Sequence, residues 1–105
     1  MVTKEEIQTL SDLLTSKFDI NRILIFGSYA SGRPSPESDL DLCITADLKN
    51  MRKIDFIRDI RRSIRNQINV PMDILVYDDT EFTQRAAHRN TMEYQILSRG
   101  ILLNG

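Results

Sequence analysis

Residues 22–32 read Arg-Ile-Leu-Ile-Phe-Gly-Ser-Tyr-Ala-Ser-Gly, and residues 38–42 read Ser-Asp-Leu-Asp-Leu. The first stretch is a short apolar run followed by glycine, which predicts a buried strand that ends in a tight turn. The second stretch alternates acidic and apolar residues. A strand there would place Asp39 and Asp41 on one face and the two leucines on the other. The chain is therefore expected to present a pair of carboxylates from a strand beside a glycine-rich turn.

The remaining pattern predicts helices and one more strand around these two. Thr3 and Glu6 have the spacing of a helix-capping box, and apolar residues then recur at helical spacing as far as Phe18. Further helices are expected over residues 51–67 and 91–99, with a third strand over 70–77, a helix capped by Asp79 or Thr80, a single helical turn over 28–32 and an apolar tail over 101–103. This order predicts one α/β (α+β) domain over residues 1–105, with a small mixed sheet flanked by helices.

Composition excludes several classes of protein. The 105 residues carry 14 basic and 15 acidic side chains, a net charge of -1, which argues against a strongly basic, non-specific nucleic-acid binder. Cys43 is the only cysteine, so an internal disulfide or a cysteine zinc site is excluded and a reducing cytoplasm is favoured. No stretch approaches the ~18 apolar residues of a membrane helix, and the polar N-terminus is not a signal peptide. We expect a soluble, cytoplasmic protein, and an oligomer is compatible with the sequence.

The acidic residues point to metal chemistry. Asp39 and Asp41 would have Cα atoms ~6.5 Å apart on one strand face, close enough to converge on Mg²⁺, which prefers oxygen ligands. Asp73 interrupts an apolar strand, where an acid is costly unless it is exposed, paired or metal-bound. Asp78 and Asp79 compete for the role of third acid, but capping or solvation explains them. The alternative for the Asp-Leu-Asp-Leu segment taken alone is a half-exposed strand with a solvated face.

Gly27 and Ser28 form the second element of the candidate site. A glycine at a strand end lets another group approach the backbone, and free N–H groups in the turn that follows could cradle a phosphate. The alternative is an ordinary strand-to-helix turn. No Gly-Lys-Ser/Thr follows, so the segment is not a P-loop.

Together these residues resemble the nucleotidyltransferase superfamily typified by DNA polymerase beta, and more narrowly its minimal nucleotidyltransferases. The matching positions are Gly27, Ser28, Ala30, Gly32, Ser38, Asp39, Asp41 and Leu42. The resemblance implies transfer of a nucleoside monophosphate, with ATP expected as donor and two Mg²⁺ ions as cofactors. It implies that Asp39 and Asp41 bind both ions, and that Asp73 binds the catalytic ion and helps to activate the acceptor hydroxyl.

Nucleotide binding is assigned on the same resemblance to Gly27, Ser28, Arg33 and Ser38. Many members carry arginine where this chain has Ser31, and Arg33 is the nearest base that could replace it. The family also implies a partner, because its small members often pair with a HEPN-domain toxin, and some add AMP to a tyrosine of that toxin. The alternative is a non-catalytic antitoxin or nucleotide-binding module that acts by occlusion.

Residues 49–65 contain seven basic and two acidic side chains, a local charge of +5. A solvated helix face is the plain interpretation of this segment. The alternative is a surface for RNA or for an acidic partner. Aromatic residues that would stack on bases are not interleaved with these charges.

Overall fold

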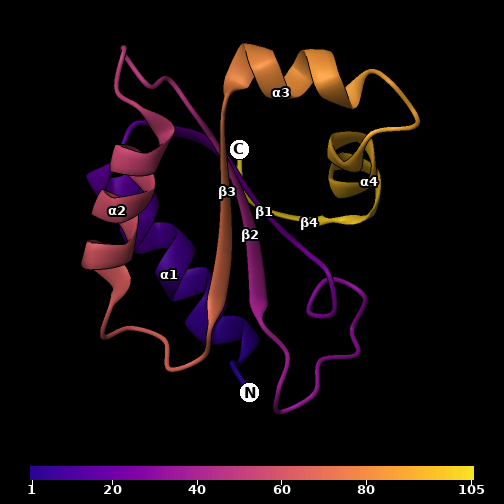
Figure 1. The fold of residues 1–105 in the computed structure, drawn as a ribbon. Coiled ribbons are helices and arrows are strands. Elements are labelled where there is room, and N and C mark those ends of the chain that lie inside the picture. The colour runs from indigo at the N-terminus through magenta and orange to yellow at the C-terminus, as the bar shows by residue number, and fades with distance from the viewer.

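A four-stranded mixed sheet separates two pairs of helices in the computed structural model, which describes residues 1–105 (Figure 1). The helices α1 and α2 lie against one face of the sheet, and α3 and α4 lie against the other. The predicted α+β architecture is confirmed. In chain order the elements are α1 (Lys4–Lys17), β1 (Ile20–Phe26), β2 (Leu40–Ala46), α2 (Lys53–Ile64), β3 (Met72–Asp78), α3 (Asp79–Ala86), α4 (Met92–Arg99) and β4 (Ile101–Asn104).

The strands follow the order β3-β2-β1-β4. β1 runs antiparallel to both of its neighbours, whereas β2 and β3 are parallel. In this register Asp41 lies opposite Phe26 of β1 on one side and opposite Asp73 of β3 on the other. Strands distant in sequence therefore bring the glycine turn and two of the predicted acids to the same end of the sheet.

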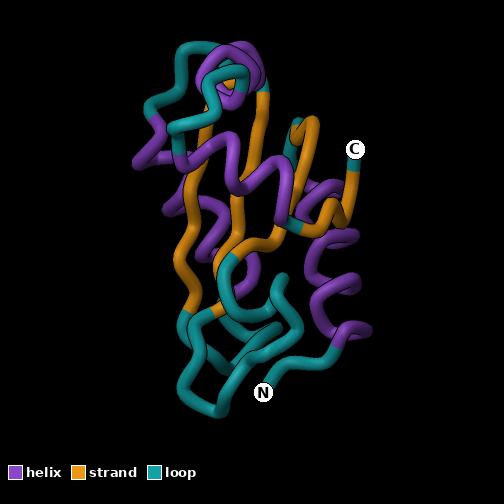
Figure 2. The backbone as a smooth tube through the Cα atoms, turned by 90° about the vertical axis from the view of Figure 1, so that its right-hand side faces the viewer, coloured by secondary structure: helices purple, strands orange, loops and turns teal.

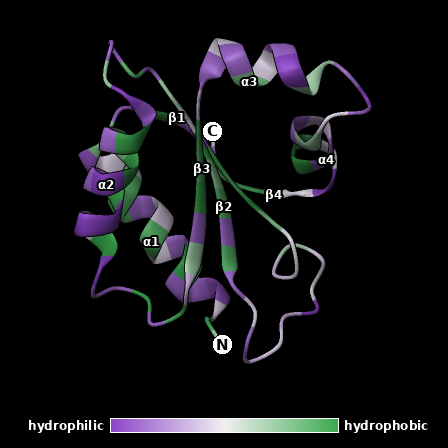
Figure 3. Ribbon diagram, in the orientation of Figure 1, coloured by the Kyte–Doolittle hydropathy of each residue, from purple (hydrophilic) through white to green (hydrophobic).

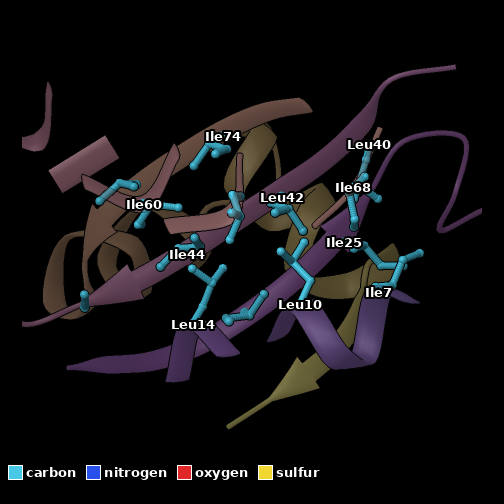
Figure 4. Close-up of a cluster of buried hydrophobic side chains, with 14 of the residues drawn as sticks. Ile7, Leu10, Leu14, Ile25, Leu40, Leu42, Ile44, Ile60, Ile68 and Ile74 are labelled. Atoms are coloured by element: carbon cyan, nitrogen blue, oxygen red, sulfur yellow. The ribbon is translucent and has the colours of Figure 1, made fainter. Parts of the chain in front are cut away.

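Strand alternation divides the core into two layers. Leu40, Leu42 and Ile44 of β2 point toward α1 and α2, where Figure 4 shows them packed with side chains of the first helix. Cys43 and Tyr77 point the other way and pack with α3 and α4. Cys43 is a buried residue of this second layer. Each face of the sheet thus needs its own helix cover, because alternate side chains on both faces are apolar.

Several local predictions agree with the structure. The capping box at the start of α1 is present, since Thr3 Oγ1 accepts from Glu6 N at 3.1 Å and Glu6 Oε1 accepts from Thr3 N at 3.0 Å. The predicted strands and helices are found within a few residues of their expected bounds. None of the helices is long and apolar enough to cross a membrane.

Two local predictions were wrong, and a third is confirmed. The apolar tail is a strand, β4, because its backbone pairs with the free edge of β1. Asp78 rather than Asp79 or Thr80 caps α3, and its side chain accepts from Thr80 N. The single helical turn predicted over residues 28–32 is present, since Ser31 N donates to the carbonyl of Gly27 at 3.1 Å, although it does not extend into a helix.

Candidate active site

Gly27 ends β1 with φ +72°, a left-handed conformation that favours glycine. A Cβ atom built on it would overlap Oδ2 of Asp41 and lie 3.2 Å from its Cγ. The lack of a side chain therefore lets the turn backbone lie directly against the Asp41 carboxylate. Backbone conformation and close approach both require glycine at this position.

The turn after Gly27 offers free donors. The carbonyl of Gly27 accepts from the N–H groups of Ala30 and Ser31 at 3.1 Å each, which closes the turn. The N–H groups of Ser28 and Tyr29 have no acceptor in the protein. Two successive free N–H groups beside a strand end suit an anion such as a phosphate. This geometry agrees with the cradle that the sequence predicts.

Asp41 and Asp73 lie side by side on the parallel strands β2 and β3 and face the α3–α4 side of the sheet. Asp41 is half-buried, while Asp73 and Asp39 are exposed. Burial raises the pKa of the Asp41 carboxyl above its usual value, and the negative charges of Asp73 and Asp39 raise it further. Mutual repulsion among carboxylates is the electrostatic condition that a bound cation would relieve.

The donor set suits a hard divalent cation, although the ligands are not fully gathered. No group of three or more acidic, cysteine or histidine side chains lies close enough to form a ready-made metal cage. Asp41 and Asp73 are adjacent, and Asp39 precedes β2 by one residue. Mg²⁺ binds through one or two carboxylates and completes its shell with water and substrate phosphates, so an adjacent pair with a third acid nearby is sufficient.

The acids stay accessible because the helices on their side of the sheet are short. α3 and α4 have eight residues each, against 14 in α1. Figure 2, which looks onto this face, shows the β1–β2 loop below the two helices, and Figure 3 shows a hydrophilic band near the beginning of β2 and of β3. A hollow of about 310 Å³ opens here, lined by Phe26, Asp41, Arg61, Asp73, Ile74, Leu75 and Met92.

A second hollow of about 340 Å³ adjoins the first, and Phe26 lines both. One wall is the turn with Gly27, Ala30 and Ser31, and the opposite wall is α4 with Gln95 and Arg99. Arg99 is exposed and forms no ion pair. Nothing in the sequence pattern indicated Gln95 or Arg99, because only the pairing of β4 with β1 returns α4 to this turn.

The structure places the other predicted residues around the loop. Ser28 is half-buried in the turn. Ser38 stabilises the loop, since its Oγ accepts from Ser35 N at 2.8 Å. Arg33 is exposed and lines neither hollow. Arg33 is the basic residue nearest to Ser31 in sequence, but Arg99 is the one that shares a hollow with Ser31.

The competing acids lie at the other end of β3. Asp78 caps α3, and Asp79 pairs with Arg22 at 3.2 Å. Asp73 lies near the beginning of the same strand and opposite Asp41, whereas Asp78 lies opposite Ala46.

A buried hydrogen bond attaches α4 to the sheet. Tyr77 Oη of β3 donates to Glu93 Oε2 of α4 over 2.6 Å, and Glu93 is only 7% exposed. Burial, together with the Glu93 carboxylate, raises the pKa of the Tyr77 hydroxyl, so the phenol keeps its proton. This contact holds the helix that carries Gln95 and Arg99 in place.

A glycine turn against strand-borne aspartates on a mixed sheet is the arrangement of a nucleotidyltransferase, and comparison with known proteins agrees. The family model described as Polymerase beta, Nucleotidyltransferase matches residues 8–104, and the chain belongs to this family. The prediction of a nucleotidyltransferase enzyme is confirmed.

Two similar proteins come from Methanocaldococcus jannaschii. The protein named "Putative protein adenylyltransferase MJ0604" is 29% identical over 98 residues, which covers 89% of this chain and 94% of that protein. A second protein, "Putative protein adenylyltransferase MJ1379", is 25% identical over 72 residues, or 69% of this chain and 72% of that protein.

Solved structures support the fold. The structure of a protein described as "a putative nucleotidyltransferase from Sulfolobus solfataricus" matches over 93% of this chain and 76% of its own, with a TM-score of 0.59 and 20% identity. A toxin–antitoxin structure with AMP-PNP covers 99% of this chain and 74% of its own, with a TM-score of 0.56 and 19% identity. The predicted resemblance to minimal nucleotidyltransferases is confirmed.

Proposed function

We propose that this protein transfers AMP from ATP to a hydroxyl acceptor, a tyrosine of a HEPN-domain toxin, and so acts as the antitoxin of a toxin–antitoxin pair in the cytoplasm. The observation that carries the proposal is the adjacency of Asp41 and Asp73 beside a glycine whose missing side chain leaves the carboxylate accessible. The names of the similar proteins support protein adenylylation. The similar toxin–antitoxin structure with AMP-PNP supports the choice of a toxin as partner.

Asp39, Asp41 and Asp73 would hold two Mg²⁺ ions, which supply positive charge to the phosphoryl oxygens and the leaving group. The chain's own residues supply position and a base. Asp73 is exposed at the edge strand, where it can accept the proton of the acceptor hydroxyl. The acceptor oxygen then bonds to the α-phosphorus as the bond to the β-phosphate oxygen breaks, and pyrophosphate leaves.

Nucleotide binding would use the turn and α4. The free N–H groups of Ser28 and Tyr29 can donate to phosphate oxygens. Arg99 lines the hollow together with Ser31 and would supply positive charge there, whereas Arg33 does not line the hollow. The departure from arginine at position 31 is thereby compensated from a different element.

Incubation with labelled ATP, Mg²⁺ and the HEPN-domain protein encoded beside this chain tests the proposal. We expect label on a tyrosine of the partner, loss of that label with Asp41→Asn, and full labelling with the control Asp12→Asn, an exposed acid on α1. Undiminished transfer by Asp41→Asn would contradict the catalytic role. A toxin that Asp39→Asn and Asp41→Asn still neutralise would instead indicate occlusion without catalysis.

A further inference from the structure

One face of α2 carries four arginines that open toward solvent. Arg58, Arg61, Arg62 and Arg65 are exposed and, with Ile54 and Ile57, line a surface hollow of about 620 Å³. Only Arg58 has an acidic partner, Asp55, at 3.2 Å. The other three guanidinium groups form no ion pair, so their charge is available to a ligand.

This arginine face is connected to the acid pair. Arg61 lines both the α2 hollow and the hollow that contains Asp41 and Asp73. Its Nη2 donates to the carbonyl of Met72 at 3.1 Å, which fixes the guanidinium at the edge of β3 next to Asp73. The three hollows therefore follow one another across the molecule, from the turn and α4, past the acids, to α2.

This order separates donor from acceptor. The second hollow, where we propose that the nucleotide binds, adjoins the acids on the β1 side, and the arginine face adjoins them on the β3 side. An acceptor hydroxyl must enter opposite the leaving pyrophosphate for an in-line displacement. The α2 side is the side of the acid hollow away from the turn where we propose that the nucleotide binds.

Resting on the proposed function, we propose that the arginine face of α2 (Ile54, Ile57, Arg58, Arg61, Arg62 and Arg65) docks an acidic protein segment that carries the acceptor hydroxyl. Charge complementarity selects the occupant, because the face is rich in unpaired guanidinium groups. A protein is favoured over RNA because Ile54, 67% exposed, and Ile57 add apolar surface while no aromatic ring lines the hollow for base stacking. The net charge of -1 also leaves no general attraction for a polyanion.

Fluorescence anisotropy with a labelled copolymer of glutamate and tyrosine tests this surface, with labelled oligouridylate as the competing ligand. The double variant Arg62→Glu/Arg65→Glu reverses two exposed charges away from the acids. The double variant Lys17→Glu/Arg89→Glu makes the same charge change at exposed positions without ion pairs elsewhere. Thermal shift with MgAMP-PNP reports folding and nucleotide binding of each variant separately.

We expect the copolymer affinity to fall about tenfold or more in Arg62→Glu/Arg65→Glu, since like charges then face each other, and to change little in the control. Equal copolymer binding by both double variants would overturn the inference, as would no binding by the parent protein. Tighter binding of oligouridylate than of the copolymer would assign the face to RNA instead. If MgAMP-PNP causes no thermal shift in the parent protein, the proposed function is refuted. The copolymer binding measurements can still be interpreted in that case, because they do not depend on the nucleotide.

Discussion

Gly27→Ala and Gly32→Ala form a matched pair that separates backbone strain from damage to the acid site. Both glycines have positive φ, +72° and +78°. A Cβ at Gly32 meets no atom within 4 Å, whereas a Cβ at Gly27 would overlap the Asp41 carboxylate. The two substitutions therefore share the cost of a left-handed backbone at alanine, and only Gly27→Ala adds the overlap with Asp41.

The shared cost is about 1–2 kcal/mol for an L-residue held in the left-handed region. Alanine also restricts the unfolded chain in both variants, and this effect cancels in the comparison. Only Gly27→Ala must also push Asp41 from its rotamer, at about 0.5–1.5 kcal/mol. The free energy of unfolding should fall in both variants. It should fall by about 0.5–1.5 kcal/mol more in Gly27→Ala, the cost of displacing the Asp41 side chain.

Urea unfolding with and without Mg²⁺ and AMP-PNP measures both parts. A ligand that binds only the folded state raises its stability, so the parent protein and Gly32→Ala should gain stability when the ligands are added. Gly27→Ala should gain little, because its Asp41 carboxylate is displaced. An equal ligand-induced gain in the two variants, or equal stability without ligand, would refute the assigned contact between Gly27 and Asp41.

Three further outcomes are expected. The pKa of Asp41 is higher in the folded protein than its unfolded value of about 4. Between these two pKa values the folded state keeps a proton that the unfolded chain has released. The contribution of Asp41 to the free energy of unfolding therefore falls as the pH rises through the raised pKa. Asp41→Asn should remove that fall and be more stable than the parent protein at pH 7 in urea without divalent cations; lower stability would contradict the repulsion. Tyr77→Phe should lower the free energy of unfolding by about 1–3 kcal/mol in thermal melts, because it leaves the buried Glu93 carboxylate without its donor; an unchanged melt would show that the bond is not needed. Arg99→Ala should weaken ATP binding by about tenfold or more in calorimetry, as for a lost hydrogen bond to a charged group, whereas Arg33→Ala should leave it unchanged; the reverse result would move the phosphate contact to the loop.

Local patterns alone were sufficient for much of the fold. The capping box before α1 and the apolar run before Gly27 depend on neighbours within a few residues, and both appear where expected. Burial of Leu40 and Leu42 opposite an accessible Asp41 follows from strand alternation, which any half-covered sheet imposes. Asp73 was predicted as the third acid because an acid inside an apolar strand is costly unless it is exposed, paired or metal-bound.

Only the tertiary structure decided what surrounds these residues. β4 has only four residues, apolar except for Asn104, and it is a strand because the edge of β1 offers partners for its backbone. That pairing returns α4 to the glycine turn and so brings Arg99, rather than Arg33, to the second hollow. Likewise, Arg61 lines the hollow that contains Asp73, where its Nη2 donates to the Met72 carbonyl on the edge strand β3.

The sequence by itself therefore predicted the candidate carboxylates and the glycine, together with the strands that carry them. Spacing along one strand is enough to pair Asp39 with Asp41, but pairing Asp41 with Asp73 requires the parallel register of β2 and β3. Register is set by packing of both sheet faces across the whole domain. For this reason the candidate site residues could be predicted from local sequence, whereas the fold decided which residues line the hollows beside them, Arg99 and Arg61 included.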